Sequence, residues 1–233
     1  MISAICRKFL PLLFLISALD SIAQVNLHAG ELELSVTGSG MIHSIRNTRT
    51  GKDYLYADTL HPLLTLVSGN QRLLPQSVKA RSGGSLLTLG FMESAVNIDI
   101  AVTAKHDYLK LTIRRAEPAA KIDAVIWGPF PTTIKDTVGE VIGVVRDQQA
   151  AIGMFVLNVK TMGGDLPNSE GSSWSRGIAA RTQSWGSSLQ AYAINRSKPR
   201  NVDAWGGVFK NMPVPVMKGE TVVGSSIALF SCS

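Results

Sequence analysis

The stretch from residue 86 to residue 114 reads LLTLGFMESAVNIDIAVTAKHDYLKLTIR, and it decides the class of fold. Apolar and polar side chains alternate in three segments of it, residues 86–91, 96–102 and 109–114. Alternation with a period of two is typical of a strand with one buried and one solvated face. The stretch therefore predicts three successive antiparallel strands.

Outward from this stretch, short apolar runs alternate with turns rich in Gly, Asn, Asp, Ser and Pro, and no convincing helix of ten residues occurs. Further strands are expected at residues 32–36, 41–46, 63–67, 124–127, 140–146, 150–158, 188–195, 205–209 and 225–230. The first two of these form a predicted hairpin across residues 38–40. Residues 161–181 predict a long exposed loop. Turns that recur at this spacing indicate an all-β sandwich or barrel.

The N-terminus has the order of parts of a secretory signal peptide. Arg7 and Lys8 precede an apolar run over residues 9–19, and small residues end at Ala23. The run is shorter than the ~20 residues that a bilayer span needs. The sequence predicts Sec-dependent export, cleavage after Ala23, a periplasmic or extracellular location, and no membrane span after cleavage.

Composition limits both stability and partners. Cys232 is the only cysteine beyond Ala23, so a core rather than disulfides must stabilise the fold. The whole chain carries 23 basic and 17 acidic residues, a formal net charge of +6, which falls to +5 without residues 1–23. Basic residues such as Arg46, Lys79 and Arg115 are spread out, which does not favour a nucleic-acid partner.

The strand pattern ends in an apolar, strand-like run over residues 222–232. Domains generally end in exposed polar segments. Residues 24–233 are therefore expected to form one β-sandwich domain, truncated at its C-terminal end as a piece of a longer protein.

Most signatures of cofactor and metal chemistry are missing from the sequence. His28, His43, His61 and His106 lie far apart, and none has a second ligand at metal-binding spacing. Phosphate-loop, dinucleotide and nucleophile-elbow motifs do not occur. No metal and no cofactor are predicted.

The carboxylates of the sequence provide no clear catalytic candidate. Glu140 is expected in an apolar strand as an outward-facing residue, because a buried acid would need a partner. Asp165 and Glu170 lie in the expected long loop, where carboxylates mostly serve solvation. Neither is predicted to be catalytic.

Four tryptophans in the second half give a more specific indication of function: Trp127, Trp174, Trp185 and Trp205. A tryptophan ring matches the C–H face of a pyranose, so all four are candidate carbohydrate-binding residues. Core packing is the competing interpretation. It is favoured for Trp127, which begins a Pro-rich turn over residues 127–131, and for Trp205, whereas both interpretations stay open for Trp174 and Trp185.

Three motifs carry a resemblance to a known family: IRNTRTGKDYL at 45–55, AVIWGPFPTT at 124–133 and GEVIGVVRD at 139–147. Together they resemble the N-terminal β-domain of secreted Bacteroidetes-type polysaccharide-degrading proteins. In that family a large antiparallel two-sheet sandwich, similar to the galactose-mutarotase supersandwich, precedes a catalytic barrel. The resemblance would cover nearly all of residues 24–233.

The resemblance implies a poly- or oligosaccharide partner and a missing C-terminal catalytic barrel that holds the acid and base of the glycoside hydrolase. The His and carboxylate of a true mutarotase have no matching positions in this sequence.

These observations lead to a non-catalytic, carbohydrate-associated sandwich as the first hypothesis. A sugar-acting lyase or epimerase is an alternative, and it requires Glu140, His106 or Arg146 to converge at a cleft. A structural envelope protein, with its tryptophans in the core, is another alternative.

Overall fold

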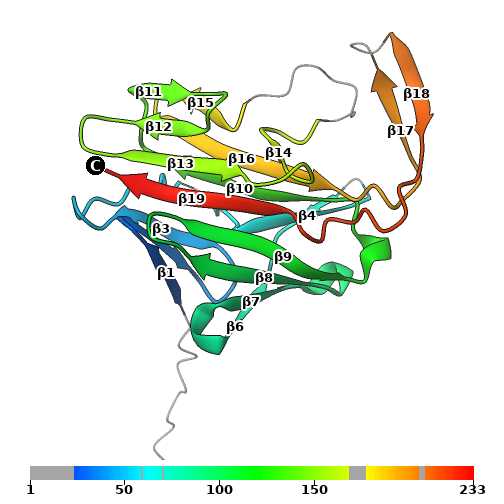
Figure 1. Ribbon diagram of the computed structural model, residues 1–233, viewed down its shortest axis with the longest axis horizontal. Coiled ribbons are helices and arrows are strands. Elements are labelled where there is room, and N and C mark those ends of the chain that lie inside the picture. The colour runs from blue at the N-terminus through cyan, green and yellow to red at the C-terminus, as the bar shows by residue number, and fades with distance from the viewer. Residues whose placement is uncertain (1–23, 59, 70, 168–176, 205–207) are drawn as a thin grey trace, which may run out of the picture.

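A computed structural model describes residues 24–58, 60–69, 71–167, 177–204 and 208–233. Strands in four antiparallel sheets make up most of this part of the chain (Figure 1). Its helical segments are three single 3₁₀ turns at Ser82–Gly84, Met92–Ser94 and Ala119–Lys121. Across the described ranges, no helix is long and apolar enough to cross a membrane.

The largest sheet has eight strands in the order β11-β12-β13-β19-β9-β8-β7-β6. Its strands are β6 (Ser77–Arg81), β7 (Leu86–Phe91), β8 (Val96–Ala104), β9 (Leu109–Glu117), β11 (Thr137–Gly139), β12 (Val144–Arg146), β13 (Ala151–Val156) and β19 (Ser226–Cys232). Strands β7, β8 and β9 pair antiparallel in succession, which confirms the prediction from residues 86–114. The sequence predicts a strand over 140–146, but β12 begins only at Val144. A turn, closed by a hydrogen bond from the Gly143 N–H to the Gly139 carbonyl, occupies the first part of that range.

The second sheet has the order β14-β16-β10-β4-β5, and β15 shares the outer edge of β16 with β14. Its strands are β4 (Leu64–Ser68), β5 (Gln71–Leu73), β10 (Ala124–Thr132), β14 (Met162–Gly163), β15 (Ala179–Gln183) and β16 (Gly186–Ile194). The expectation of a loop over 161–181 is wrong at both ends, where β14 and the start of β15 pair with β16.

β10 continues through the Pro-rich sequence over 127–131, for which the sequence predicts a turn. A β-bulge shifts its register against β16 between Trp127 and Phe130. In a regular strand, residues i and i+3 point to opposite faces of the sheet. The bulge instead lets the rings of Trp127 and Phe130 both enter the core. Gly128 makes the bulge possible with a φ of 86°.

Two smaller sheets complete the described fold. β1 (Val25–Ala29), β2 (Leu32–Val36) and β3 (Ile42–Asn47) form a three-stranded sheet, and β2 and β3 are the predicted hairpin. β17 (Arg200–Ala204) and β18 (Phe209–Val214) form a separate hairpin. Of the expected strand over 205–209, Val208 lies in a turn and Phe209 begins β18, whereas residues 205–207 lie outside the described ranges.

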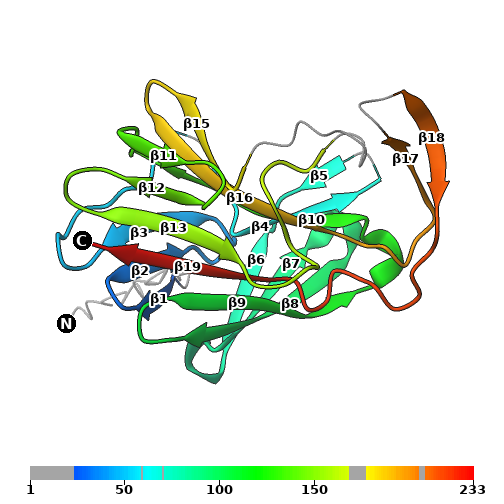
Figure 2. The same cartoon turned by 45° about the horizontal axis from the view of Figure 1, so that its top comes forward.

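The core lies between the eight-stranded sheet on one side and the six- and three-stranded sheets on the other (Figures 1 and 2). Its largest fully buried side chains are Trp127, Tyr54, Phe91, Phe130, Leu32, Leu34, Leu63, Leu64, Leu66, Leu87, Leu89 and Ile98. The fold is thus an all-β antiparallel sandwich, as the sequence predicts.

Candidate functional site

The four predicted tryptophans have different environments. Trp127 is 0% exposed, and its indole N–H donates to the Ser225 hydroxyl at 2.9 Å. Its ring packs in the core and offers no face to a sugar, so a carbohydrate-stacking role is wrong for Trp127 and core packing holds. Trp174 and Trp205 lie outside the described residues.

Trp185 sits in the turn between β15 and β16 and is half-buried. Its ring stacks on Tyr56, with the ring centroids 4.0 Å apart and the planes 10° from parallel. One face of each ring is therefore occupied by the other. The exposed remainder of this pair stays a candidate contact for a sugar.

The three residues of the enzyme alternative do not come together. Glu140 is exposed in the β11–β12 turn, Arg146 is exposed at the other end of β12, and His106 lies in the β8–β9 turn beside Asp107. Among the described residues, no hydrogen bond or ion pair joins any two of these three. Of the loop carboxylates, Asp165 accepts a bond from Gln190 at 3.0 Å, and Glu170 lies outside the described ranges.

A pocket of about 550 Å³ opens on the outer face of the eight-stranded sheet. Strands β13 and β19 form its floor, and the β1–β2 and β8–β9 turns form its rim. The residues that line it are Gly30, Glu31, Asp107, Tyr108, Phe155, Leu157, Ala228, Phe230, Ser231 and Cys232. Its volume falls within the range of roughly 300–1,000 Å³ that is usual for small-molecule sites.

Two phenylalanines give the pocket an aromatic floor. The rings of Phe155 and Phe230 lie 5.0 Å apart between centroids and are tilted by 32°. Gly153, which pairs with Phe230 across the sheet, makes room for that ring, because a Cβ there would lie 2.1 Å from Phe230 Cζ. Phe155 is 44% exposed, so part of the floor faces solvent.

Two acids stand on the rim of the pocket. The turns that carry Glu31 and Asp107 touch at Gly30, where a Cβ would lie 3.0 Å from the Asp107 Cα. Hydrogen bonds from Asn47 and Ser233 lower the pKa of Glu31, so its carboxylate is ionised at neutral pH. The rim therefore presents fixed hydrogen-bond acceptors beside an apolar floor.

The motif over residues 45–55 supports this rim. The buried Asn47 side chain donates to Glu31 at 3.0 Å and to the Ser231 hydroxyl at 2.9 Å, and it accepts a bond from the Thr50 N–H at 2.8 Å. A single amide thus joins β3, β19 and the β1–β2 turn. The pattern Asn-Thr-x-Thr-Gly-Lys consequently has a positioning role beside the pocket.

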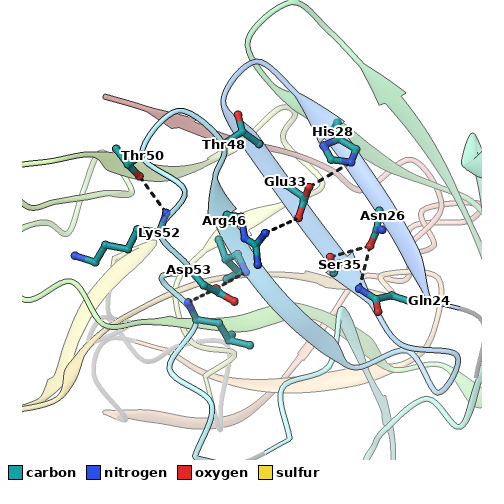
Figure 3. Close-up of polar contacts among 12 residues, drawn as sticks. Gln24, Asn26, His28, Glu33, Ser35, Arg46, Thr48, Thr50, Lys52 and Asp53 are labelled. Atoms are coloured by element: carbon teal, nitrogen blue, oxygen red, sulfur yellow. Dashed lines mark hydrogen bonds and ion pairs between the residues drawn. The ribbon is translucent and has the colours of Figure 1, made fainter.

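The outward face of the three-stranded sheet is polar (Figure 3). Glu33 lies between His28 and Arg46 in one cross-strand row. Its carboxylate oxygens are 3.6 Å from His28 Nε2 and 4.0 Å from Arg46 Nη1. Asn26 accepts bonds from Ser35 at 2.8 Å and Gln24 at 3.0 Å. Exposed pairs of this kind contribute about 0–1 kcal/mol each, so this face is best explained as a solvated surface that fixes strand register.

A second polar cluster joins the loop after β3 to the β12–β13 turn. Asp147 binds Lys52 at 3.0 Å and the buried Tyr54 hydroxyl at 3.4 Å, and it accepts the Ala150 and Gln149 N–H groups. Partial burial alone would raise the pKa of Asp147, but bonds from Ala150, Lys52 and Gln149 together lower it. Burial raises the pKa of Tyr54.

Replacing Asp147 with asparagine is expected to lower the free energy of unfolding at neutral pH by about 1–2 kcal/mol, because a charged acceptor is lost. A lowered folded-state pKa stabilises the protein above the unfolded pKa of about 4, and that contribution is lost as the pH falls through the folded value. Urea unfolding at a series of pH values should therefore show the difference between wild type and Asp147→Asn shrinking in acid.

The exposed Asp136→Asn variant is the matched control for this series. A difference between wild type and Asp147→Asn that stays constant down to the acid limit would contradict the assigned role of the charge.

The similarity of this chain to known proteins is weak. No family model matches the sequence, and no curated protein matches it. Among solved structures, the chain is similar to a galactose mutarotase related enzyme from Lactobacillus acidophilus, with 8% sequence identity and a TM-score of 0.39. The similarity covers 91% of this chain and 98% of that chain.

The pocket could not be predicted from the sequence. Phe155 and Phe230 both lie in strands that the sequence predicts, but the sequence does not show the pairing of β13 with β19 that brings Phe230 opposite Gly153. Of the tryptophan candidates, the two that the structure describes lie elsewhere, Trp185 in the β15–β16 turn and Trp127 in the core.

Proposed function

We propose that this chain is an exported, carbohydrate-associated β-sandwich that binds a short saccharide in the pocket over β13 and β19. The observation that carries the proposal is the aromatic floor of Phe155 and Phe230 beside the carboxylates of Glu31 and Asp107. A sugar ring has apolar C–H faces and a rim of hydroxyl groups, so it needs both kinds of surface at once.

The proposed role is binding rather than bond cleavage by this chain alone. Glycoside hydrolysis requires one carboxyl group that holds a proton near neutral pH. Glu31 is poorly suited to that role, because its pKa is lowered and its oxygens accept bonds from Asn47, Ser233 and Arg49. The catalytic barrel of a glycoside hydrolase-like protein, as the sequence resemblance implies, would supply the acid and base.

Export belongs to the same proposal. The signal-peptide pattern of residues 1–23 supports delivery to the periplasm or the exterior, where polysaccharide is encountered. Residues 24–233 would then be the mature sandwich domain.

Replacing Gly153 with alanine is expected to weaken saccharide binding about tenfold or more, which corresponds to about 1.4 kcal/mol. The added methyl would displace the Phe230 ring while leaving every lining side chain present. Calorimetric titration of the chain from Gln24 onward against a panel of plant and host oligosaccharides measures the affinity, and a reducing-sugar assay detects any cleavage.

Phe155→Ala should weaken binding to a similar extent, whereas Met92→Ala, which removes an exposed side chain in the β7–β8 turn, should not. Saccharide binding accompanied by new reducing ends would contradict the non-catalytic assignment. No binding by a folded sample would remove the proposed function and favour a structural role.

A further inference from the structure

We propose that the β17–β18 hairpin docks the protein on the surface of an anionic phospholipid bilayer. This arm stands apart from the sandwich, with each strand paired to the other (Figures 1 and 2). An isolated two-stranded hairpin is marginally stable in water, so a free-standing one gains stability from whatever covers it.

The arm and the segment after it expose a concentration of large apolar side chains. They are Val208, Phe209, Met212, Val216 and Met217. Val208 is 75% exposed and Phe209 is 50% exposed, and every residue of β18 except Val214 is exposed. Soluble proteins rarely expose such a patch unless it meets a protein or a membrane.

The arm and the segment after it also carry a net positive charge. Residues 200–218 contain three basic residues, Arg200, Lys210 and Lys218, against the single acid Asp203, which gives a formal net charge of +2. Between Val208 and Lys218 the only charges are the two lysines.

The combination of charge and apolar surface selects the partner. A nucleic acid or an anionic polysaccharide would account for the lysines but not for the exposed Phe209 and Met212. A neutral protein surface would account for these two apolar side chains but not for the lysines. A bilayer with anionic headgroups accepts apolar side chains at the acyl boundary and lysine ammonium groups at the phosphates.

The position of the arm suits this role. The C-terminal end of β19, whose residues 230–232 line the pocket, and the β17–β18 arm lie at opposite ends of the molecule (Figures 1 and 2). A protein held on lipid by the arm would keep that pocket directed away from the bilayer.

Flotation with lipid vesicles tests the proposal. The chain from Gln24 onward is used, so that the apolar run over residues 9–19 does not itself bind lipid. It is expected to float with phosphatidylcholine vesicles that contain phosphatidylglycerol, about tenfold more than with phosphatidylcholine alone, and high salt should reverse this binding.

Two double variants separate the contributions of the arm. Phe209→Ser with Met212→Ser, and Lys210→Ser with Lys218→Ser, should each lower the vesicle-bound fraction about tenfold. All four side chains are exposed, and circular dichroism confirms that each variant is folded. Val159→Ser and Lys79→Ser remove exposed side chains elsewhere and should leave binding unchanged.

Equal binding to neutral and anionic vesicles, no binding to either, or binding that survives both arm variants would overturn the proposal. A mixed result in which only the control variants reduce binding would also assign the lipid contact to another surface.

Discussion

Replacing Trp127 with alanine is expected to lower the free energy of unfolding by about 3–5 kcal/mol, the range for removing a large aromatic side chain from a packed core. The ring is 0% exposed between the two main sheets, so its loss leaves a cavity that the neighbouring strands cannot fill without moving. Urea unfolding followed by circular dichroism measures the change without relying on tryptophan fluorescence.

Trp185→Ala is the matched comparison for Trp127→Ala. Its ring is half-buried against Tyr56, so the expected loss of stability is about 1 kcal/mol. Trp127→Phe should cost less than Trp127→Ala, because it keeps most of the ring but loses the bond to Ser225. Equal midpoints for Trp127→Ala and wild type would show that the ring does not hold the sheets together.

Strand alternation predicts the centre of this fold well. In β7, β8 and β9 one face is buried and the other solvated, so the local pattern and the tertiary environment agree. The β2–β3 hairpin follows for the same reason.

Local pattern fails where the pairing partner decides the structure. β17 and β18 contain Asn, Asp, Lys and Pro, which disfavour strands, yet they form a hairpin with ladder bonds of their own. The sequence predicts that β10 ends before Gly128, whereas a bulge carries it on to Thr132. Both outcomes depend on register, which one strand alone does not specify.

The two proposed surfaces are hidden in the sequence for related reasons. Phe155 and Phe230 are 75 positions apart and meet only because β13 pairs with β19. The apolar residues and the two lysines between Val208 and Lys218 are visible in the sequence, but only the pairing of β18 with β17 places Phe209, Lys210 and Met212 on a projecting arm. The sequence therefore shows which residue types are present for these surfaces, and strand pairing determines which of those residues lie together.

Replacing Gly128 with alanine is expected to lower the free energy of unfolding by about 2–4 kcal/mol. Its φ of 86° is strained for a residue with a side chain, and the added Cβ would lie 2.6 Å from the Phe130 N and 3.1 Å from the Leu189 carbonyl oxygen. Both are backbone atoms, so the bulge itself must shift. That shift would move Trp127 and Phe130 out of their positions in the core.

Gly51→Ala isolates the conformational part of this effect. Gly51 has a similar φ of 72°, but nothing lies within 4 Å of the place that an added Cβ would take, so the expected cost is only about 1 kcal/mol. Urea unfolding of both variants gives the comparison. Because the two variants share the backbone strain, the difference between their free energies of unfolding measures the steric requirement of the bulge. If Gly128→Ala were no less stable than Gly51→Ala, β10 could bring the Trp127 and Phe130 rings into the core without that glycine.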